Sequence, residues 1–323
     1  MTVRGSGRAV VTGGAGFIGS TLVDRLLADG WTVTAVDAFE GGYGRDVKER
    51  NLAGAARSPR FTLVEADTRD ALAIRNALRQ AEPDVVFDLA ARAGVRPSLA
   101  DPGSYIATNV AGLQNTLSAA AASHARVVFA SSSSVYGNDD RRPFHEDQAR
   151  GRPESPYGAT KIAGEALAHA HHRAVGTPVA VARLFTVYGP RQRPDLAIHA
   201  FARRILGGQV IDLFDRGQGV RDYTYVDDVV EALIGMAERT EGFVILNIGS
   251  DRPIRTADVV SELERSLRMP ARRQLLPAQP GDVSATHADI TAARDLLGWE
   301  PRMPFPDGID RFTEWLRSES NAA

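Results

Sequence analysis

The sequence predicts an α/β protein with a doubly wound parallel sheet and a smaller C-terminal substrate-binding lobe. Two observations favour this fold class: short apolar strand patterns alternate with Ala- and Leu-rich helical stretches, and a glycine-rich turn joins the first strand to the first helix. Strands that are apolar throughout and separated by helices are typical of a parallel sheet covered on both faces. A chain of 323 residues can bury a core large enough to divide into two lobes.

Several stretches have the length and apolar content of buried strands. They are residues 8–12, 31–36, 60–66, 84–89, 126–130 and 179–184. Helical stretches such as residues 108–117 separate them. Pro- and Arg-rich loops follow the last strand, so we predict a cofactor-binding domain of residues 1–185 with a return segment at 223–249. The substrate-binding lobe is then expected to comprise residues 186–222 and 250–323.

The first strand runs directly into a glycine-rich turn that opens a helix, which is the order a Rossmann dinucleotide site requires. Gly13 and Gly16 let the backbone bend and approach a pyrophosphate, and Gly19 lets the helix pack closely on the strand. The helix N-terminus faces the anion. We therefore predict cofactor contacts along this turn, at Gly13, Gly16, Phe17, Ile18 and Gly19.

Acidic residues end the second and third predicted strands. Asp37 lies about twenty residues after the glycines, where a carboxylate can accept hydrogen bonds from a ribose diol and repel a 2′-phosphate. This position favours NAD over NADP as the cofactor. Asp67, at the end of the third strand, is a candidate for the rim of the adenine pocket.

Only two of the 38 basic side chains are lysines, Lys48 and Lys161. Lys161 lies four residues after Tyr157, a step that puts both side chains on one face of a helix. A compact ammonium there can lower the pKa of the phenol from roughly 10 toward neutrality. Tyr-x-x-x-Lys is a weak pattern that by itself favours two surface side chains on an ordinary helix, but the glycine turn changes this interpretation and favours a catalytic base at Tyr157.

The composition excludes several other classes of protein. A net charge of −2 does not favour binding to nucleic acid or to an anionic membrane. No apolar run approaches the roughly 20 residues of a membrane span. The absence of cysteine excludes disulfides and thiolate ligands. Three of the seven histidines, His169, His171 and His172, lie on a polar helical stretch and are expected to be solvated. We expect a cytoplasmic protein without a metal site.

With these motifs the chain resembles the extended short-chain dehydrogenases of the NAD-dependent epimerase/dehydratase family, which epimerise, dehydrate or decarboxylate nucleotide sugars. The resemblance runs nearly end to end and includes Ser131-Ser132-Ser133-Ser134-Val135-Tyr136-Gly137 and Arg221-Asp222-Tyr223. It implies a catalytic triad of Ser132, Tyr157 and Lys161, further cofactor contacts and a homodimer. The further cofactor contacts are Leu89, Ala90, Ala91 and Asn109.

The resemblance also implies a chemistry that begins with oxidation at C4 of the sugar. Tyr157 would take the O4 proton with help from Ser132, and Lys161 would hold the nicotinamide ribose. Dehydratases carry an Asp-Glu pair where this chain has Ser133 and Ser134. Two serines cannot supply an acid and a base, so dehydration is disfavoured. The related decarboxylases have Glu at the position of Ser134, so decarboxylation is less favoured.

The UDP-glucuronate 4-epimerases form the group that the sequence resembles most, which predicts an isomerase acting on a UDP-sugar. The resemblance implies that the substrate carboxylate is gripped by short hydroxyls and an arginine fork. The implied substrate contacts are Arg96, Ser133, Ser134, Thr186 and Arg193, with Arg221, Gln279 and Asp282 at the nucleotide end.

Three positions depart from the family pattern. Many relatives have Asn in place of Thr186 and Arg in place of Gln279, and often His in place of Asp88. We expect Asp88 to change a hydrogen bond at the end of the fourth strand without loss of activity. Alternatives are a UDP-glucuronate decarboxylase, a UDP-glucose 4-epimerase, and a non-catalytic protein that senses NAD(H) on the same fold.

Overall fold

The computed structural model describes residues 7–40, 44–149, 151–278 and 283–322. A seven-stranded sheet dominates the fold, with strand order β10-β6-β5-β4-β1-β2-β3 and every neighbouring pair parallel. Its strands are β1 (Arg8–Thr12), β2 (Thr32–Asp37), β3 (Phe61–Glu65), β4 (Val85–Asp88), β5 (Arg126–Ser132), β6 (Val179–Leu184) and β10 (Phe243–Ile248). The predicted α/β fold class is therefore confirmed, and every predicted strand lies in this sheet.

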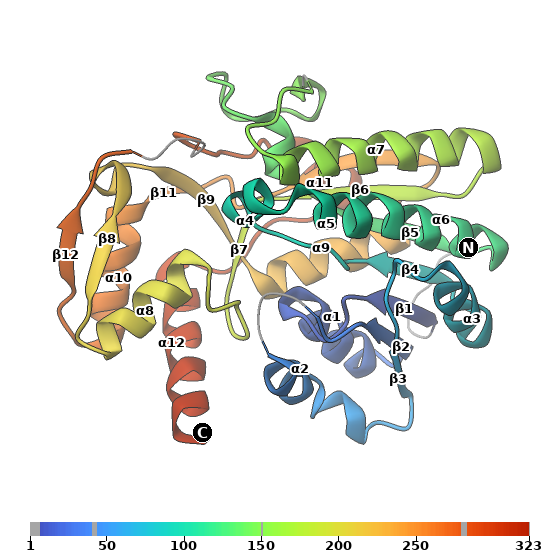
Figure 1. Ribbon diagram of the computed structural model, residues 1–323, viewed down its shortest axis with the longest axis horizontal. Helices are drawn as coiled ribbons and strands as arrows, with labels where there is room; N and C mark the ends of the chain where they lie inside the picture. The colour runs from blue at the N-terminus through green and yellow to red at the C-terminus, as the bar shows by residue number, and fades with distance from the viewer. Residues whose placement is uncertain (1–6, 41–43, 150, 279–282, 323) are drawn as a thin grey trace.

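Helices cover both faces of the large sheet (Figure 1). Neighbouring residues of β1 point to opposite sides: Val10 belongs to one apolar core, and Ala9 and Val11 belong to the other. The first core is closed by α3 (Ala71–Ala81), α6 (Leu113–Ala122) and α7 (Pro156–Val175). The second is closed by α1 (Phe17–Ala28), α9 (Val226–Arg239) and α11 (Thr291–Leu297). This double burial explains why the inner strands are rich in apolar residues, whereas β3 at the edge of the sheet is half-exposed.

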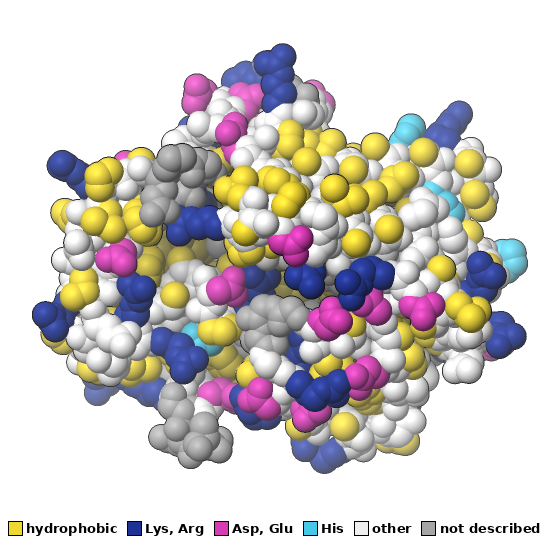
Figure 2. Space-filling view, in the orientation of Figure 1, with side chains coloured by type: hydrophobic (Ala, Val, Ile, Leu, Met, Phe, Trp, Pro, Cys, Tyr) yellow, Lys and Arg dark blue, Asp and Glu magenta, His cyan; other side chains and the backbone are white. Residues whose placement is uncertain are grey.

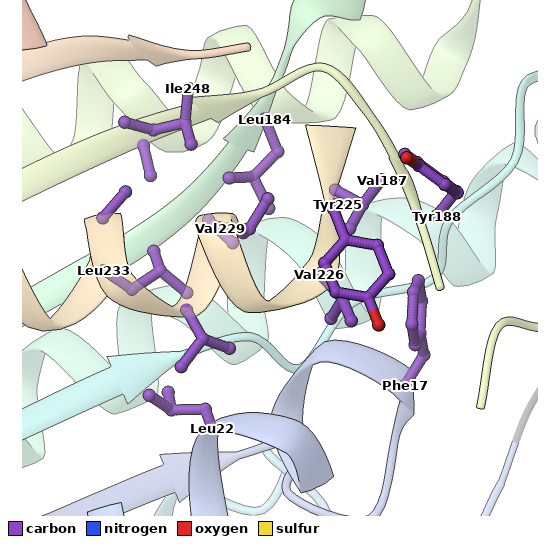
Figure 3. Packing of buried hydrophobic residues seen from close by; sticks show 14 of the residues in the cluster. Phe17, Leu22, Leu184, Val187, Tyr188, Tyr225, Val226, Val229, Leu233 and Ile248 are labelled. Carbon is purple, nitrogen blue, oxygen red and sulfur yellow. The ribbon is translucent and has the colours of Figure 1, made fainter. Parts of the chain in front are cut away.

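Figure 3 shows the second core from close by, with Leu22 of α1 facing Val229 and Leu233 of α9. Ile248 of β10 lies in the same core, at the other side of α9. The segment after residue 225 thus returns to the large sheet and helps to bury α1. Residues 223–225, expected in this return segment, instead end a strand of a smaller sheet.

Two smaller sheets lie beside the large one. The first has the order β11-β9-β7 and the second pairs β8 with β12. Their strands are β7 (Thr186–Tyr188), β8 (Val210–Leu213), β9 (Val220–Tyr225), β11 (Pro253–Arg255) and β12 (Arg272–Leu275). Their helices are α8 (Ala197–Leu206), α10 (Thr256–Leu267) and α12 (Phe305–Ala322). In Figure 1, β8, β12, α8 and α10 form a group on the left, away from the large sheet.

Short helices occupy several connections. They are α2 (Arg45–Leu52), α4 (Val95–Ala100), α5 (Pro102–Ile106) and single turns at Ala55–Arg57, Ser133–Tyr136, Glu146–Gln148 and Phe214–Gly217. Residues 108–117, predicted as one helix, are helical throughout but not one α-helix. Ala107–Gly112 form a wider π-helical stretch, and α6 begins after it. Gly112 lets this stretch approach Thr68, since a Cβ atom there would lie 2.6 Å from the Thr68 hydroxyl.

The surface carries mixed charge. On the face shown in Figure 2, basic and acidic side chains are interspersed over the right half of the molecule. Within the described ranges, no helix combines the length and the apolar character that crossing a membrane requires. Of the three histidines expected to be solvated, His169 is exposed, and His171 and His172 are half-buried. The ring centroids of His169 and His172 lie 5.0 and 6.1 Å from that of Phe243.

Candidate active site

A cavity of about 930 Å³ follows the carboxyl ends of the parallel strands, from the glycine turn to β7 and β9. This is the edge at which doubly wound sheets bind their ligands. Most of the predicted site residues border it. They are Gly13, Gly16, Phe17, Ile18, Gly19, Asp37, Asp67, Leu89, Ala90, Ala91, Ser132, Ser133, Ser134, Tyr157, Lys161, Thr186, Arg193 and Arg221.

The glycine turn has the shape of a dinucleotide cradle. Gly13 has a positive φ of 67°, and a Cβ atom on it would lie 2.9 Å from the backbone nitrogen of Ala90. A Cβ atom on Gly19 would lie 2.2 Å from the carbonyl oxygen of Gly13. The twelve-residue helix α1 begins directly after Gly16, with its N-terminus at the cavity. The turn therefore fits a pyrophosphate bound by backbone N–H groups.

Asp37 ends β2 and is 4% exposed. Its Oδ2 accepts a hydrogen bond from Ala15 N (3.0 Å), and its Oδ1 accepts one from Phe39 N (2.8 Å). Lys48 Nζ donates to the same Oδ1 at 2.7 Å. The carboxylate is thus ion-paired with a lysine to which the sequence analysis gave no role. The scarcity of lysine was the signal that could have identified it.

Asp67, predicted for the rim of the adenine pocket, borders the cavity and is hydrogen-bonded to Arg69. Its carboxylate accepts hydrogen bonds from the backbone nitrogen and from Nε of Arg69, each at 2.8 Å. The hydrogen bond with the Arg69 side chain holds the pKa of Asp67 below its ordinary value. Arg69 also donates to Glu40 at 2.9 Å, so the rim carries paired charges of both signs.

The three predicted catalytic side chains come together at the other end of the cavity. Ser132 ends β5, and Tyr157 and Lys161 lie one turn apart on α7. The local sequence places this helix: Ser155 caps it by accepting a hydrogen bond from Gly158 N at 3.1 Å, and Pro156 occupies its first position. Ser132 Oγ donates to Ser134 Oγ at 3.1 Å.

The electrostatics of Tyr157 differ from the prediction. Burial raises the pKa of its phenol, and the hydrogen bond with Ser132 and the charge of Arg193 oppose that rise. Lys161 Nζ donates to Ala130 O at 2.7 Å and lies 6.0 Å from the centroid of the tyrosine ring. Burial also lowers the pKa of Lys161 to about 8, against the opposing charges of Asp88 and Glu165.

Asp88 lies at the end of β4, as predicted, and is 3% exposed. It accepts a hydrogen bond from Thr12 Oγ1 at 2.8 Å, and burial raises the pKa of its carboxyl. Its charge acts on Lys161 from behind the cavity wall. Asp88 is therefore hydrogen-bonded to Thr12 behind the cavity wall and is not among the residues that border the cavity.

Two of the residues predicted to contact a ligand are not among those that border the cavity. Asn109 Oδ1 accepts from Arg92 N (2.7 Å), while its Nδ2 donates to Arg92 O (2.9 Å) and to Thr160 Oγ1 (3.0 Å). It supports the cavity wall from behind and does not line it. Arg96 is exposed on α4, with its guanidinium 5.2 Å from the centroid of the Phe214 ring. Gln279 and Asp282 lie outside the described residues.

The residues predicted for the uronate grip border the same cavity as Tyr157. Thr186 begins β7, Ser133 and Ser134 follow β5, and Arg193 lies in the loop before α8. The guanidinium of Arg193 is paired with Asp195, a partner that the sequence analysis did not consider. Arg221 of β9 also borders the cavity and donates to Val220 O at 2.8 Å.

Comparison with known proteins gives a family. The model of the NAD dependent epimerase/dehydratase family matches residues 9–249. The chain is 37% identical to UDP-glucuronate 4-epimerase 5 of Arabidopsis thaliana, over 95% of this chain and 74% of the relative.

Two solved structures are similar over nearly the whole chain. UDP-glucuronic acid 4-epimerase from Bacillus cereus, in complex with UDP-glucuronic acid and NAD, has a TM-score of 0.90 and 33% identity, covering 96% of this chain and 99% of that one. UDP-glucose 4-epimerase from Thermotoga maritima, with UDP-glucose, has a TM-score of 0.89 and 31% identity, covering 97% and 99%. The chain therefore belongs to the NAD dependent epimerase/dehydratase family and is an NAD-dependent sugar-nucleotide epimerase.

Proposed function

We propose that the protein is a UDP-glucuronate 4-epimerase, which interconverts UDP-glucuronate and UDP-galacturonate. The observation that carries the proposal is the position of Arg193 on the wall of the cavity that also contains Tyr157. A guanidinium at the sugar end of a buried site suits an anionic sugar. The similarity to named UDP-glucuronate 4-epimerases supports the same substrate.

Tyr157 and Ser132 perform the proton transfers. The Tyr157 phenolate takes the proton from O4 of the sugar, assisted by the Ser132 hydroxyl, and later returns it. NAD, when bound in this cavity, would supply the redox chemistry, as the acceptor and later the donor of the C4 hydride. Inversion requires that the 4-keto sugar turn its opposite face before the hydride returns. Lys161 holds the cofactor ribose beside Tyr157.

The uronate creates a side reaction that the site must suppress. A 4-keto uronic acid is a β-keto acid, and it loses CO₂ when the bond to its carboxylate aligns with the carbonyl π system. Ser133, Ser134 and Thr186 offer hydroxyl donors along one part of the cavity wall. Together with Arg193 they hold both carboxylate oxygens away from that alignment.

A second candidate is UDP-glucose 4-epimerase activity. Asp195 already neutralises Arg193, and a neutralised arginine favours a neutral sugar. The similarity to the Thermotoga maritima enzyme is in line with this alternative. The two candidates differ in whether Arg193 contributes to substrate binding.

The deciding experiment is incubation of the purified protein with UDP-glucuronate and separation of the products. We expect UDP-galacturonate, no consumption of added NAD, and little CO₂. Stoichiometric CO₂ would identify a decarboxylase, and a strong preference for UDP-glucose would identify a neutral-sugar epimerase.

A pair of arginine variants tests the carboxylate grip. Arg193→Ala is expected to weaken UDP-glucuronate binding by about 1.5–3 kcal/mol, the range of a charge-assisted hydrogen bond, with little effect on UDP-glucose. It should also release more CO₂. Arg191→Ala is the matched control, since Arg191 pairs with Asp24 at 2.8 Å and does not border the cavity. Equal losses for both sugar nucleotides would remove Arg193 from carboxylate recognition.

A further inference from the structure

The segment of residues 283–289 is hydrogen-bonded to neighbouring chain on both of its sides. On one side it pairs with β9, where Val220 N donates to Ser284 O and Thr286 N donates to Val220 O, each at 3.1 Å. On the other side it contacts the polar loop of residues 138–149. Thr286 borders the cavity of the candidate active site. The polar loop therefore supports this part of the cavity wall from outside.

Arg142 makes the side-chain contacts between the polar loop and the segment, together with Asn138. Arg142 Nη2 donates to Ser284 Oγ at 2.8 Å, and its Nε donates to Ala285 O at 3.2 Å. Asn138 Oδ1 accepts hydrogen bonds from Ser284 N at 3.2 Å and from Ser284 Oγ at 3.3 Å. One guanidinium thus joins two consecutive residues of the segment. A planar fork can bind both acceptors at once, whereas an ammonium is a point charge.

The same segment contacts Arg221, which the sequence analysis predicts for the nucleotide end of the substrate. Arg221 borders the cavity, and its Nη1 donates to Val220 O at 2.8 Å and to Ser284 O at 3.5 Å. Ser284 therefore contacts Arg142 through its hydroxyl and Arg221 through its carbonyl. Arg142 itself is not among the residues that border the cavity. Its effect on a ligand must pass through Ser284 or through its charge.

We propose that Arg142 is a positioning residue for the nucleotide end of the substrate. It fixes Ser284 and Ala285 against the polar loop, and Ser284 in turn holds Arg221 where the diphosphate binds. A guanidinium that is already in place binds the anion without a further loss of side-chain freedom. The role assigned to Arg142 requires that the nucleotide lie at Arg221, and it does not depend on which sugar is the substrate.

Binding of UDP to the NAD-loaded protein tests this role without involving the sugar. Arg142→Ala should raise the dissociation constant of UDP about fivefold, the size of one hydrogen bond, and leave that of NAD unchanged. With UDP-sugar as substrate, KM should rise by the same factor, while kcat stays within about twofold because the reacting groups are untouched. Unchanged UDP affinity in Arg142→Ala would overturn the proposal.

Two further arginine variants separate position from charge. Arg141→Ala removes the same charge from the neighbouring residue, whose guanidinium pairs with Asp139 within the polar loop, and should leave UDP binding unchanged. Arg142→Lys keeps the charge but cannot bind both acceptors, and should weaken UDP binding at least about threefold. Full UDP affinity in Arg142→Lys, or an equal loss in Arg141→Ala, would show that only the positive charge matters.

A double-mutant cycle identifies the path of the effect. Ser284→Ala removes the hydroxyl that Arg142 Nη2 binds and should weaken UDP binding by itself. In combination with Arg142→Ala it should add little, because both changes remove the same contact. Two losses that multiply in full would show that Arg142 does not act through Ser284. Circular dichroism checks the fold of each variant, and if Arg142→Ala does not fold, Ser284→Ala and Arg142→Lys decide.

Discussion

Asp195 pairs with the guanidinium of Arg193, and both residues border the cavity of the candidate active site. Arg193 Nε donates to Asp195 Oδ1 at 2.9 Å, and Nη2 donates to Oδ2 at 2.6 Å. An incoming substrate thus meets an arginine whose charge is already balanced. A uronate must share or displace this internal carboxylate, whereas a neutral sugar does not compete with it.

Asp195→Asn should therefore strengthen binding of UDP-glucuronate, by about 1 kcal/mol or roughly fivefold, because it removes the competing negative charge. Binding of UDP-glucose should change little. Calorimetric titration of the cofactor-loaded protein with each nucleotide sugar measures the difference. Weaker binding of UDP-glucuronate would mean instead that Asp195 orients Arg193 for its ligand.

Tyr157→Phe should lower turnover by about two or more orders of magnitude, the usual effect of losing an acid-base group. The phenyl ring keeps the packing against Tyr105, whose ring centroid lies 6.2 Å away. Affinities for cofactor and sugar nucleotide should stay nearly unchanged. Turnover measured under substrate saturation, together with both dissociation constants, checks this prediction, and near-normal turnover would exclude Tyr157 as the base.

Lys161 should make stability depend on pH above neutrality. Burial lowers its pKa to about 8 from an ordinary value of 10.5, so between these values the unfolded chain binds a proton that the folded chain does not. The unfolding free energy of the cofactor-free protein should therefore rise relative to Lys161→Met by up to about 2 kcal/mol from pH 8 to 10. Urea titrations at several pH values measure the difference. A difference that stays constant with pH would contradict the lowered pKa.

Glu165 and Arg183 form a buried ion pair beside the catalytic residues. Arg183 Nε and Nη2 donate to the two oxygens of Glu165 at 3.0 and 2.8 Å, and Ser131 Oγ donates to Glu165 Oε1 at 2.5 Å. Glu165→Gln leaves a buried guanidinium without its counter-charge and should destabilise the fold by about 3–5 kcal/mol. Glu82→Gln, which breaks an exposed pair with Arg8, is the control and should have little effect. Denaturant unfolding of both variants distinguishes them, and equal small effects would contradict the prediction.

Gly19→Ala should abolish NAD binding, because its new Cβ atom would lie 2.2 Å from the Gly13 carbonyl oxygen and force the cradle apart. Gly54→Ala is a suitable control, since the nearest atom to its Cβ would be Asp24 Oδ1 at 3.8 Å. The NAD content of the purified variants and their dissociation constants for NAD give the comparison. Normal binding by Gly19→Ala would show that the turn can relax around a side chain.

The inner strands of the large sheet could be predicted because burial on both faces makes them rich in apolar residues. β10 was expected only as part of a return segment, because Phe243, Val244 and Ile245 at the sheet edge are only half-buried and its pattern is weaker. The glycine turn and the pair Tyr157 and Lys161 were predictable from spacing within single elements. Such spacing is local information that the chain carries directly.

The rest of the site depends on contacts between distant elements. The pairing of Lys48 with Asp37 joins a helix to a strand end, and that of Glu165 with Arg183 joins α7 to β6. No periodicity predicts such partners. The directions of the Asn109 and Arg96 side chains likewise depend on tertiary neighbours, and neither residue is among those that border the cavity.

Both side-chain amines of this protein, those of Lys48 and Lys161, lie inside its active cavity. A reagent directed at primary amines thus finds no surface lysine to attack while the chain is folded. The extent to which Lys48 and Lys161 are acylated in the folded protein would report whether the cavity is open or filled. A support that couples to lysine would have to react with residues inside the cavity. Coupling through surface carboxylates would leave those lysines unmodified.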